Sequence, residues 1–170
     1  MMPLYAILQH GLFYGAILSV LLSVLIVGSL YWRPMIWIGD APKEVQAVAP
    51  SPSAADRRAK LLLSLLFFGV LLGDIVVALV TLRDLGGGML AFSDAFLATF
   101  ILFETFNLVD LLIIDWLIVE WWRPGFITFP GAEGMDFFGG YAYHFRGFLI
   151  GTVFGLVGSL VVAAAAVALL

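Results

Sequence analysis

The segment GFLIGTVFGLVGSLVVAAAAVALL, residues 147–170, contains no charged side chain. As an α-helix it would rise by about 1.5 Å per residue and reach about 36 Å, which exceeds the roughly 30 Å hydrocarbon core of a bilayer. A run of this length and composition predicts a helix that crosses a membrane.

Three more apolar runs precede this segment, at residues 4–32, 61–82 and 93–120. The chain is 63% hydrophobic and 12% charged, and its mean hydropathy is +1.11, whereas soluble domains are about 45–50% apolar and about 25% charged. We therefore expect an all-α integral membrane protein, with residues 1–170 forming a single four-transmembrane-helix bundle. Loops at residues 33–60, 83–92 and 121–146 would connect the spans.

The basic residues predict the orientation of the bundle. Loops rich in Lys and Arg stay on the cytoplasmic side, and seven of the eight basic residues fall in the first and third loops. Both termini are then expected outside, in a bacterial-type inner membrane. The first loop holds Arg33, Lys43, Arg57, Arg58 and Lys60, the third holds Arg123 and Arg146, and the second holds Arg83.

Composition and missing motifs argue against several classes of protein. A net charge of −4 without a basic stripe argues against nucleic-acid binding, and the absence of cysteine excludes disulfides, thiolate nucleophiles and Cys-ligated metals. With no nucleotide-binding, hydrolase or metalloprotease motif, we expect no enzyme, no cofactor and no metal. His10 and His144 fall on opposite membrane sides in this topology, so they cannot ligate one haem.

A weak internal repeat is visible where two spans end. YWRP (residues 31–34) follows the first span and WWRP (residues 121–124) follows the third, which would fit two helix pairs in parallel orientation. Interfacial aromatics, a snorkelling Arg and a helix-ending Pro also suit any cytoplasmic boundary, so the boundary reading stands beside the repeat.

Small residues recur at every fourth position on one face of several spans, where they would let helix backbones approach closely. These faces predict either contacts within the bundle or a homo-oligomer. The glycines concerned are Gly11 and Gly15, Gly69 and Gly73, and Gly147, Gly151 and Gly155.

Carboxylates inside the spans are the main functional signal, because intramembrane acids are costly and commonly functional. Asp74 and Glu104 fall at similar predicted depth and would share a proton or cation, together with Asn107 and Asp110. At 100° per residue Glu104, Asn107, Asp110 and Asp115 share one sector of about 140°. Asp115 and Glu120 continue this line as a cytoplasmic exit.

Two functions follow from these acids and faces. The first is proton- or cation-linked transport through the carboxylates of the second and third spans. The alternative is a non-catalytic accessory or assembly subunit of a larger membrane complex, in which protonated acids hydrogen-bond between helices and Asp115 and Glu120 pair with arginines at the interface. The expected partners are the lipid bilayer and either further copies of the chain or that complex.

Overall fold

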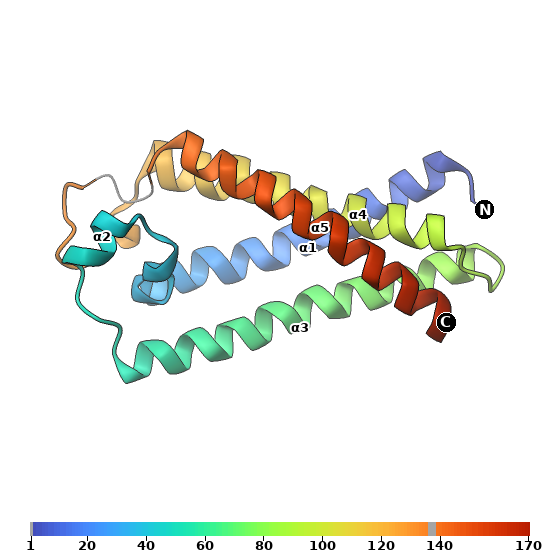
Figure 1. Ribbon diagram of the computed structural model, residues 1–170, viewed down its shortest axis with the longest axis horizontal. Helices are drawn as coiled ribbons and strands as arrows, with labels where there is room; N and C mark the ends of the chain where they lie inside the picture. Colours follow the sequence, from blue (N-terminus) through green and yellow to red (C-terminus); the bar gives the residue numbers. More distant parts are fainter. Residues whose placement is uncertain (1, 136–138) are drawn as a thin grey trace.

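The computed structural model describes residues 2–135 and 139–170, and within them the chain is all-helical, with 83% helix and no strand. Four helical segments are long and apolar enough to cross a membrane. Both termini lie at one end, called the terminal end below, and α2 (Lys43–Val48) lies at the other, called the loop end (Figure 1). The four segments are α1 (Leu4–Trp32), α3 (Ala54–Leu85), α4 (Phe92–Val109) continued by the π-helix η2 (Asp110–Trp122), and α5 (Tyr141–Leu169).

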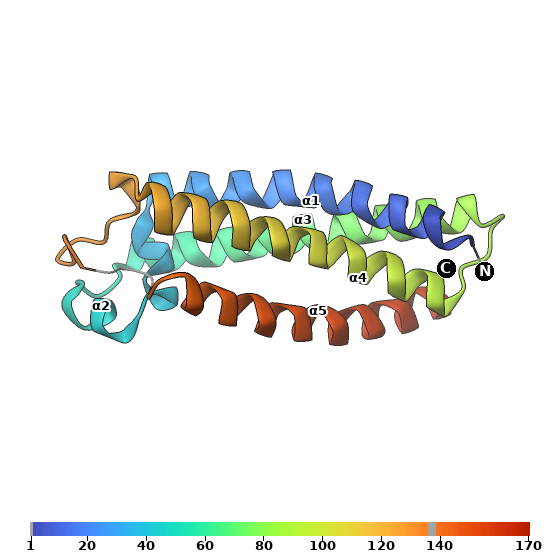
Figure 2. The same ribbon diagram turned by 90° about the horizontal axis from the view of Figure 1, so that it is seen from above.

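The helix α4 is the centre of the arrangement, since it packs against both α1 and α5, while α1 also packs against α3. Its buried face contributes Ala95, Ala98 and Leu102 to a core that also holds Leu18 and Leu82. Figure 1 shows α3 and α5 far apart at the loop end and closer together at the terminal end. Figure 2 shows α4 running between α1 and α5. The bundle has an opening on one side, a cavity that residues of both α3 and α5 line near the loop end.

Close helix contacts occur where glycines face α4. A Cβ added to Gly11 would lie 2.9 Å from the Ile101 Cβ, and one added to Gly15 would lie 2.6 Å from the Thr105 Cβ. On the other side of α4, a Cβ on Gly151 would lie 2.6 Å from the Asn107 Oδ1.

The remaining glycines of the predicted faces differ in their surroundings. A Cβ on Gly155 would collide with the Phe103 ring of α4, whereas one on Gly69, Gly73 or Gly147 would meet no atom within 4 Å. These last three glycines make no close helix contact within the described chain. Their packing role therefore stays a prediction, and it would require a helix of another copy or of another protein.

The helix α3 begins at Ala54, well before the predicted start of the second span at residue 61. Ser53 and Asp56 form a capping box, in which the Ser53 side chain accepts a hydrogen bond from the Asp56 amide and the Asp56 carboxylate accepts one from the Ser53 amide. Such a box satisfies amides that the first helical turn leaves free. The charged residues 56–60, predicted as loop, are therefore helical and extend α3 beyond its apolar part.

A small cap closes the loop end. It consists of the 3-10 helix η1 (Pro34–Asp40), α2, the 3-10 helix η3 (Gly125–Ile127) and the chain that follows η3. Their apolar side chains form a second core of Ile38, Ala41, Val45, Phe129 and Ala132. The loop that follows η3 thus packs against η1 and α2 at this end, and residues 136–138 of this loop lie outside the described residues.

The two Arg-Pro motifs end their helices in different ways. Arg33 has φ −153° after α1, whereas Arg123 adopts the left-handed conformation with φ 48° after η2. Arg33 pairs with Asp56 of α3, and Arg123 pairs with Glu120 of its own helix. A short 3-10 helix follows each motif, and a duplication stays a prediction.

Candidate functional site

The second half of the third span is a π-helix, η2, of 13 residues. A π-helix closes i→i+5 hydrogen bonds, so residues five apart follow one another along its axis. Asp110, Asp115 and Glu120 have this spacing. In an α-helix, two residues five positions apart point about 140° away from each other. The wider π-helix reduces this angle, so the three acids lie closer to one face, which is the face toward α5.

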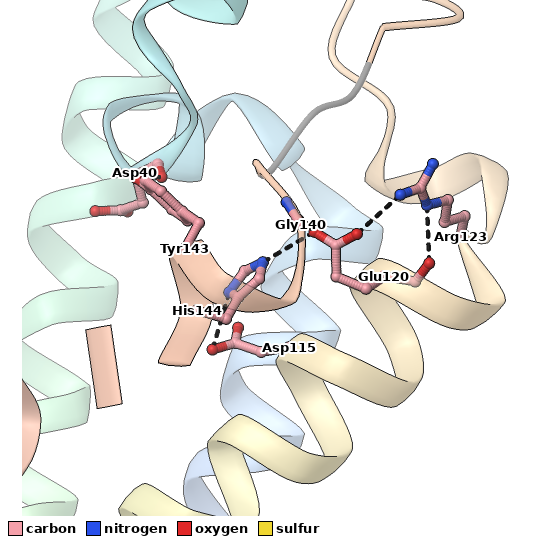
Figure 3. Close-up of polar contacts among 7 residues, drawn as sticks. All are labelled: Asp40, Asp115, Glu120, Arg123, Gly140, Tyr143 and His144. Carbon is pink, nitrogen blue, oxygen red and sulfur yellow. Dashed lines mark hydrogen bonds and ion pairs between the residues drawn. The ribbon is translucent and has the colours of Figure 1, made fainter. Parts of the chain in front are cut away.

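His144 in the first turn of α5 lies between two of these acids (Figure 3). Its Nδ1 is 3.0 Å from Asp115 Oδ2, and its Nε2 is 3.3 Å from Glu120 Oε1. The imidazole and the Glu120 side chain are only 8% and 3% exposed. A protonated imidazole donates from both ring nitrogens, whereas a neutral one donates from only one. This trio therefore responds to the gain or loss of one proton.

Glu120 is held by groups other than the imidazole. Arg123 Nη2 lies 2.8 Å from Glu120 Oε2, and the amide of Gly140 donates to Glu120 Oε1 at 3.0 Å (Figure 3). Arg123 reaches back because its left-handed backbone turns the chain, and its Nε donates to the Glu120 carbonyl. The pairing of Glu120 with Arg123 is the interfacial ion pair considered from the sequence.

The site of His144 requires a correction to the sequence analysis. The fourth span was expected to begin at residue 147, which would have left His144 in a loop and the second, third and fourth spans without a Lys, Arg or His. The helix instead begins at Tyr141, directly after Gly139 and Gly140 with φ 77° and 83°. Asp115 consequently pairs with His144 of the facing helix. The accessory-subunit alternative had expected an arginine as its partner.

A second group of polar side chains lies deeper, between α4 and α5. Thr152 donates to Glu104 Oε2 at 3.0 Å, and Asn107 Nδ2 donates to Thr152 Oγ1 at 3.2 Å and to the Phe148 carbonyl at 3.2 Å. The other Glu104 oxygen is buried without a hydrogen-bond partner in the described chain. Glu104 and Asn107 thus both face α5, as the single polar sector of this span predicted.

Asp74 stands apart from this group. It belongs to α3, and its Oδ2 is buried without a hydrogen-bond partner among the described residues. Glu104 is bonded toward α5, and α3 and α5 line opposite sides of the opening in the bundle. The sharing of a proton between Asp74 and Glu104 stays a prediction, and no hydrogen bond within the described chain supports it.

A cavity of about 830 Å³ occupies the opening between α3 and α5 near the loop end. All four long helices and η1 contribute to its wall. Asn107, Asp110, Asp115 and His144 line it, so three of the six polar residues predicted for the site share one space that is large enough for water. Its volume is in the range of small-molecule sites, about 300–1,000 Å³.

The loop-end rim of the cavity carries further charges. Asp40 of η1 and Lys60 of α3 both line it, and the Tyr143 hydroxyl donates to the Asp40 carbonyl at 2.9 Å. Desolvation by the cap raises the pKa of the Asp40 carboxyl, and the nearby Lys60 ammonium partly opposes this by lowering it. The cap therefore both positions α5 and supplies polar groups to the cavity mouth.

Sequence reasoning missed several members of this site. His144 could have been found because a Gly-Gly pair favours a break in regular structure and glycine is accepted at a helix N-cap, so residues 139–140 were a usable signal. Thr152 has no such signal, because a lone threonine in an apolar span is usually unremarkable. Asp40, Lys60 and Tyr143 reach the cavity only through the fold of the cap.

Comparisons with known proteins give no family for this chain. No family model matches it, and neither a curated protein nor a solved structure is significantly similar to it.

The site is suited to proton exchange. It combines carboxylates, an imidazole, a hydroxyl and an amide, which are the groups that donate and accept protons in membrane relays. Adjacent groups of the site are either hydrogen-bonded at about 3 Å or line the same cavity. The cavity is large enough for water, since one water molecule occupies about 30 Å³.

Proposed function

We propose that the chain is a multi-pass membrane protein that couples proton movement to transport along the interface of α4, η2 and α5. The observation that carries the proposal is the sequence of ionisable and polar groups from Glu104, through Thr152 and Asn107, to Asp115, His144 and Glu120. Asp110 faces the cavity between the two parts of this series. We call this series the polar seam.

The proposed orientation follows from the ends of the seam. Seven of the eight Lys and Arg residues belong to the loop end or to the adjoining helix turns, and Arg83 lies near the terminal end. By the positive-inside rule the loop end would face the cytoplasm of a bacterial-type cell and both termini would lie outside. The seam then connects the middle of the bilayer with the cytoplasmic mouth.

The proposal moves the central site away from the pair of acids expected from the sequence. Glu104 keeps its role because it is bonded into the seam, whereas no hydrogen bond among the described residues links Asp74 to the seam. A proton that moves between Glu104 and Asp115 would travel by Asn107, Asp110 and water in the cavity. This is a relay by hydrogen bonds, so it needs neither a metal nor a covalent step.

Proton influx into liposomes tests the proposal. The purified chain is reconstituted with a trapped pH-sensitive dye, and a potassium diffusion potential, negative inside, is applied. We expect the wild type to acidify the lumen faster than protein-free liposomes do, and Glu104→Gln and Asp110→Asn to lose most of this excess rate. Asp84→Asn is the matched control, because Asp84 is 61% exposed near the terminal end and pairs only with Arg83 in the described chain.

Two results would count against a proton path. The first is a wild-type rate equal to that of protein-free liposomes, and the second is equal rates for the wild type and both seam variants. Each variant is first compared with the wild type by size-exclusion chromatography and circular dichroism, so that a folding defect is not read as a blocked path.

The accessory-subunit alternative rests on a different surface. Gly69 and Gly73 lie on α3 where an added Cβ meets no atom of the described chain, and Leu65, Leu72 and Val76 beside them are exposed. A small-residue face of this kind suits a helix from another copy or another protein. Cross-linking in native membranes through a cysteine at residue 69 would test it, and a monomeric pattern would remove this alternative.

A further inference from the structure

The cavity has an apolar and aromatic wall on most of its surface. Rings of Trp37, Phe67, Phe106 and Phe148 line it together with aliphatic side chains such as Ile114. The rings of Phe67 and Phe106 meet edge to face, with centroids 6.1 Å apart. Such a wall binds lipophilic groups, and aromatic faces also attract cations.

The charges of the cavity are unevenly placed. Lys60 and Arg146 line it from the second turns of α3 and α5 and are exposed at the loop end, where basic side chains commonly reach toward the headgroups. Asp110 lies about one helical turn farther from that end than Asp115. The interior end of the cavity is therefore acidic, and the basic groups are at its mouth.

Two acids line the cavity without a hydrogen bond or ion pair to their carboxylates in the described chain, and of these Asp110 lies at the interior end, whereas Asp40 lies at the mouth. Asp115 contacts His144, and Glu120 contacts His144 and Arg123. Asp110 lines the cavity and makes no hydrogen bond or ion pair with any residue of the described ranges 2–135 and 139–170. A carboxylate in an apolar setting needs a proton or a cation to offset its desolvation.

Access to this acid is lateral. The walls include Leu63 and Phe67 of α3 and Phe148 and Ile150 of α5, the two helices that Figure 1 shows far apart at the loop end. The outward faces of both helices are apolar and exposed, including Leu62 and Leu66 of α3 and Leu149 and Val153 of α5. In a bilayer the opening would face lipid, so a solute dissolved in the membrane reaches it directly.

We propose that the cavity binds a lipophilic organic cation, which enters from the membrane between α3 and α5 and replaces a proton on Asp110. The inference rests on the proposed function, since it names the substrate class of the same site. The exchange is balanced, because one cation is bound as one proton leaves the carboxyl group.

Other charged and titratable groups also face the cavity, and they bear on this exchange. They are Asp40 of η1, Lys60 of α3, Asp115 of η2, and Tyr143, His144 and Arg146 of α5, whereas the α1 residues in its wall, Ile26 and Leu30, are aliphatic. Lys60 and Arg146 disfavour a bound cation near the mouth of the cavity, but both lie away from its acidic interior end. The ring of His144 is engaged by Asp115 and Glu120.

Equilibrium binding to the full-length chain in mild detergent tests the inference. Tetraphenylphosphonium is the probe, and tetraphenylborate is its control, because the two ions have nearly the same size and shape and opposite charge. We expect the cation to bind and its affinity to rise with pH, by up to about tenfold per pH unit where one proton is displaced. Asp110→Asn should weaken binding by about tenfold or more, since loss of a buried charge partner has at least this effect.

The controls separate this inference from the proton path. Asp84→Asn should bind the cation as the wild type does. If Asp110→Asn fails to fold, the wild-type comparison of the two probes and the pH dependence of cation binding still decide the matter. Tighter binding of tetraphenylborate, or cation affinity that is independent of pH, would overturn the inference.

Binding and proton influx can fail separately. Absent cation binding combined with Asp110-dependent proton influx would overturn the substrate class and leave the proton path standing. Cation binding with the expected pH dependence, in liposomes without proton influx, would support the inferred site and remove only the continuous path along the polar seam.

Discussion

Replacement of Gly15 by alanine is expected to destabilise the contact between α1 and α4. The new Cβ would lie 2.6 Å from the Thr105 Cβ and 2.9 Å from the Leu102 carbonyl oxygen. Both are atoms of the backbone or attached directly to it, so neither can swing aside. The helices must separate by about 1 Å to restore an ordinary contact of about 3.5 Å.

The expected size of this effect follows from two opposing contributions. Overpacking of a close contact costs about 1–3 kcal/mol, while alanine is favoured over glycine within a helix by up to about 1 kcal/mol. Gly15→Ala should therefore lower the free energy of unfolding by up to about 2 kcal/mol. Gly69→Ala is the matched control, because its Cβ meets nothing within 4 Å and only the favourable contribution of about 1 kcal/mol applies.

Reversible unfolding in mixed micelles measures both variants. The fraction of denaturing detergent is raised, and helix content is followed by circular dichroism. We expect Gly15→Ala to unfold at a lower fraction than the wild type and Gly69→Ala at an equal or higher one. If the two variants unfold together, α1 and α4 do not approach through this glycine, and the position of α4 that presents Glu104 to α5 would have to be reconsidered.

Three further predictions concern the polar groups. Thr152→Val removes the hydroxyl that donates to Glu104 and should cost about 0.6–1.7 kcal/mol in the same unfolding assay, whereas Val153→Thr on the exposed face should change little. Asp40→Asn should flatten the pH dependence of stability. The pKa of the folded Asp40 carboxyl is raised, so the wild type loses stability as pH rises from about 4 through that raised value, and an unchanged pH profile would contradict this. Ser53→Ala removes the cap of α3 and should cost about 1 kcal/mol, while equal unfolding midpoints would show that the cap contributes nothing.

The four long helices were predictable because each consists of a long apolar run that differs sharply from its connections. The ends of α3 and α5 were not found, since hydropathy marks where a helix becomes apolar rather than where it begins. The start of α3 depends on Ser53 and Asp56, and that of α5 on glycines with positive φ. Both signals are local and can be read only if helix starts are sought separately from spans.

The register of the acids could not be predicted in the same way. On an α-helix Asp110, Asp115 and Glu120 are about 140° apart in turn, so at most part of the series faces one neighbour. The π-helix changes this register, so that two of the acids meet one residue of the facing helix. His144 approaches both Asp115 and Glu120 from α5, and a wider turn is what allows two acids five residues apart to meet one imidazole.

A five-residue spacing of acids in an apolar span therefore has a meaning that depends on its partner. On an isolated α-helix, acids with this spacing point in different directions. Each charged acid near the bilayer centre then costs about 2.5–3.5 kcal/mol and needs a separate partner to offset that cost. Where two such acids face one histidine, as Asp115 and Glu120 face His144, the three side chains can share one proton. Asp110 has the same spacing but no second histidine opposite it, and the cavity lies there instead. On this difference along one helix we base both proposals, that the bonded acids relay a proton and that Asp110 exchanges its proton for a ligand.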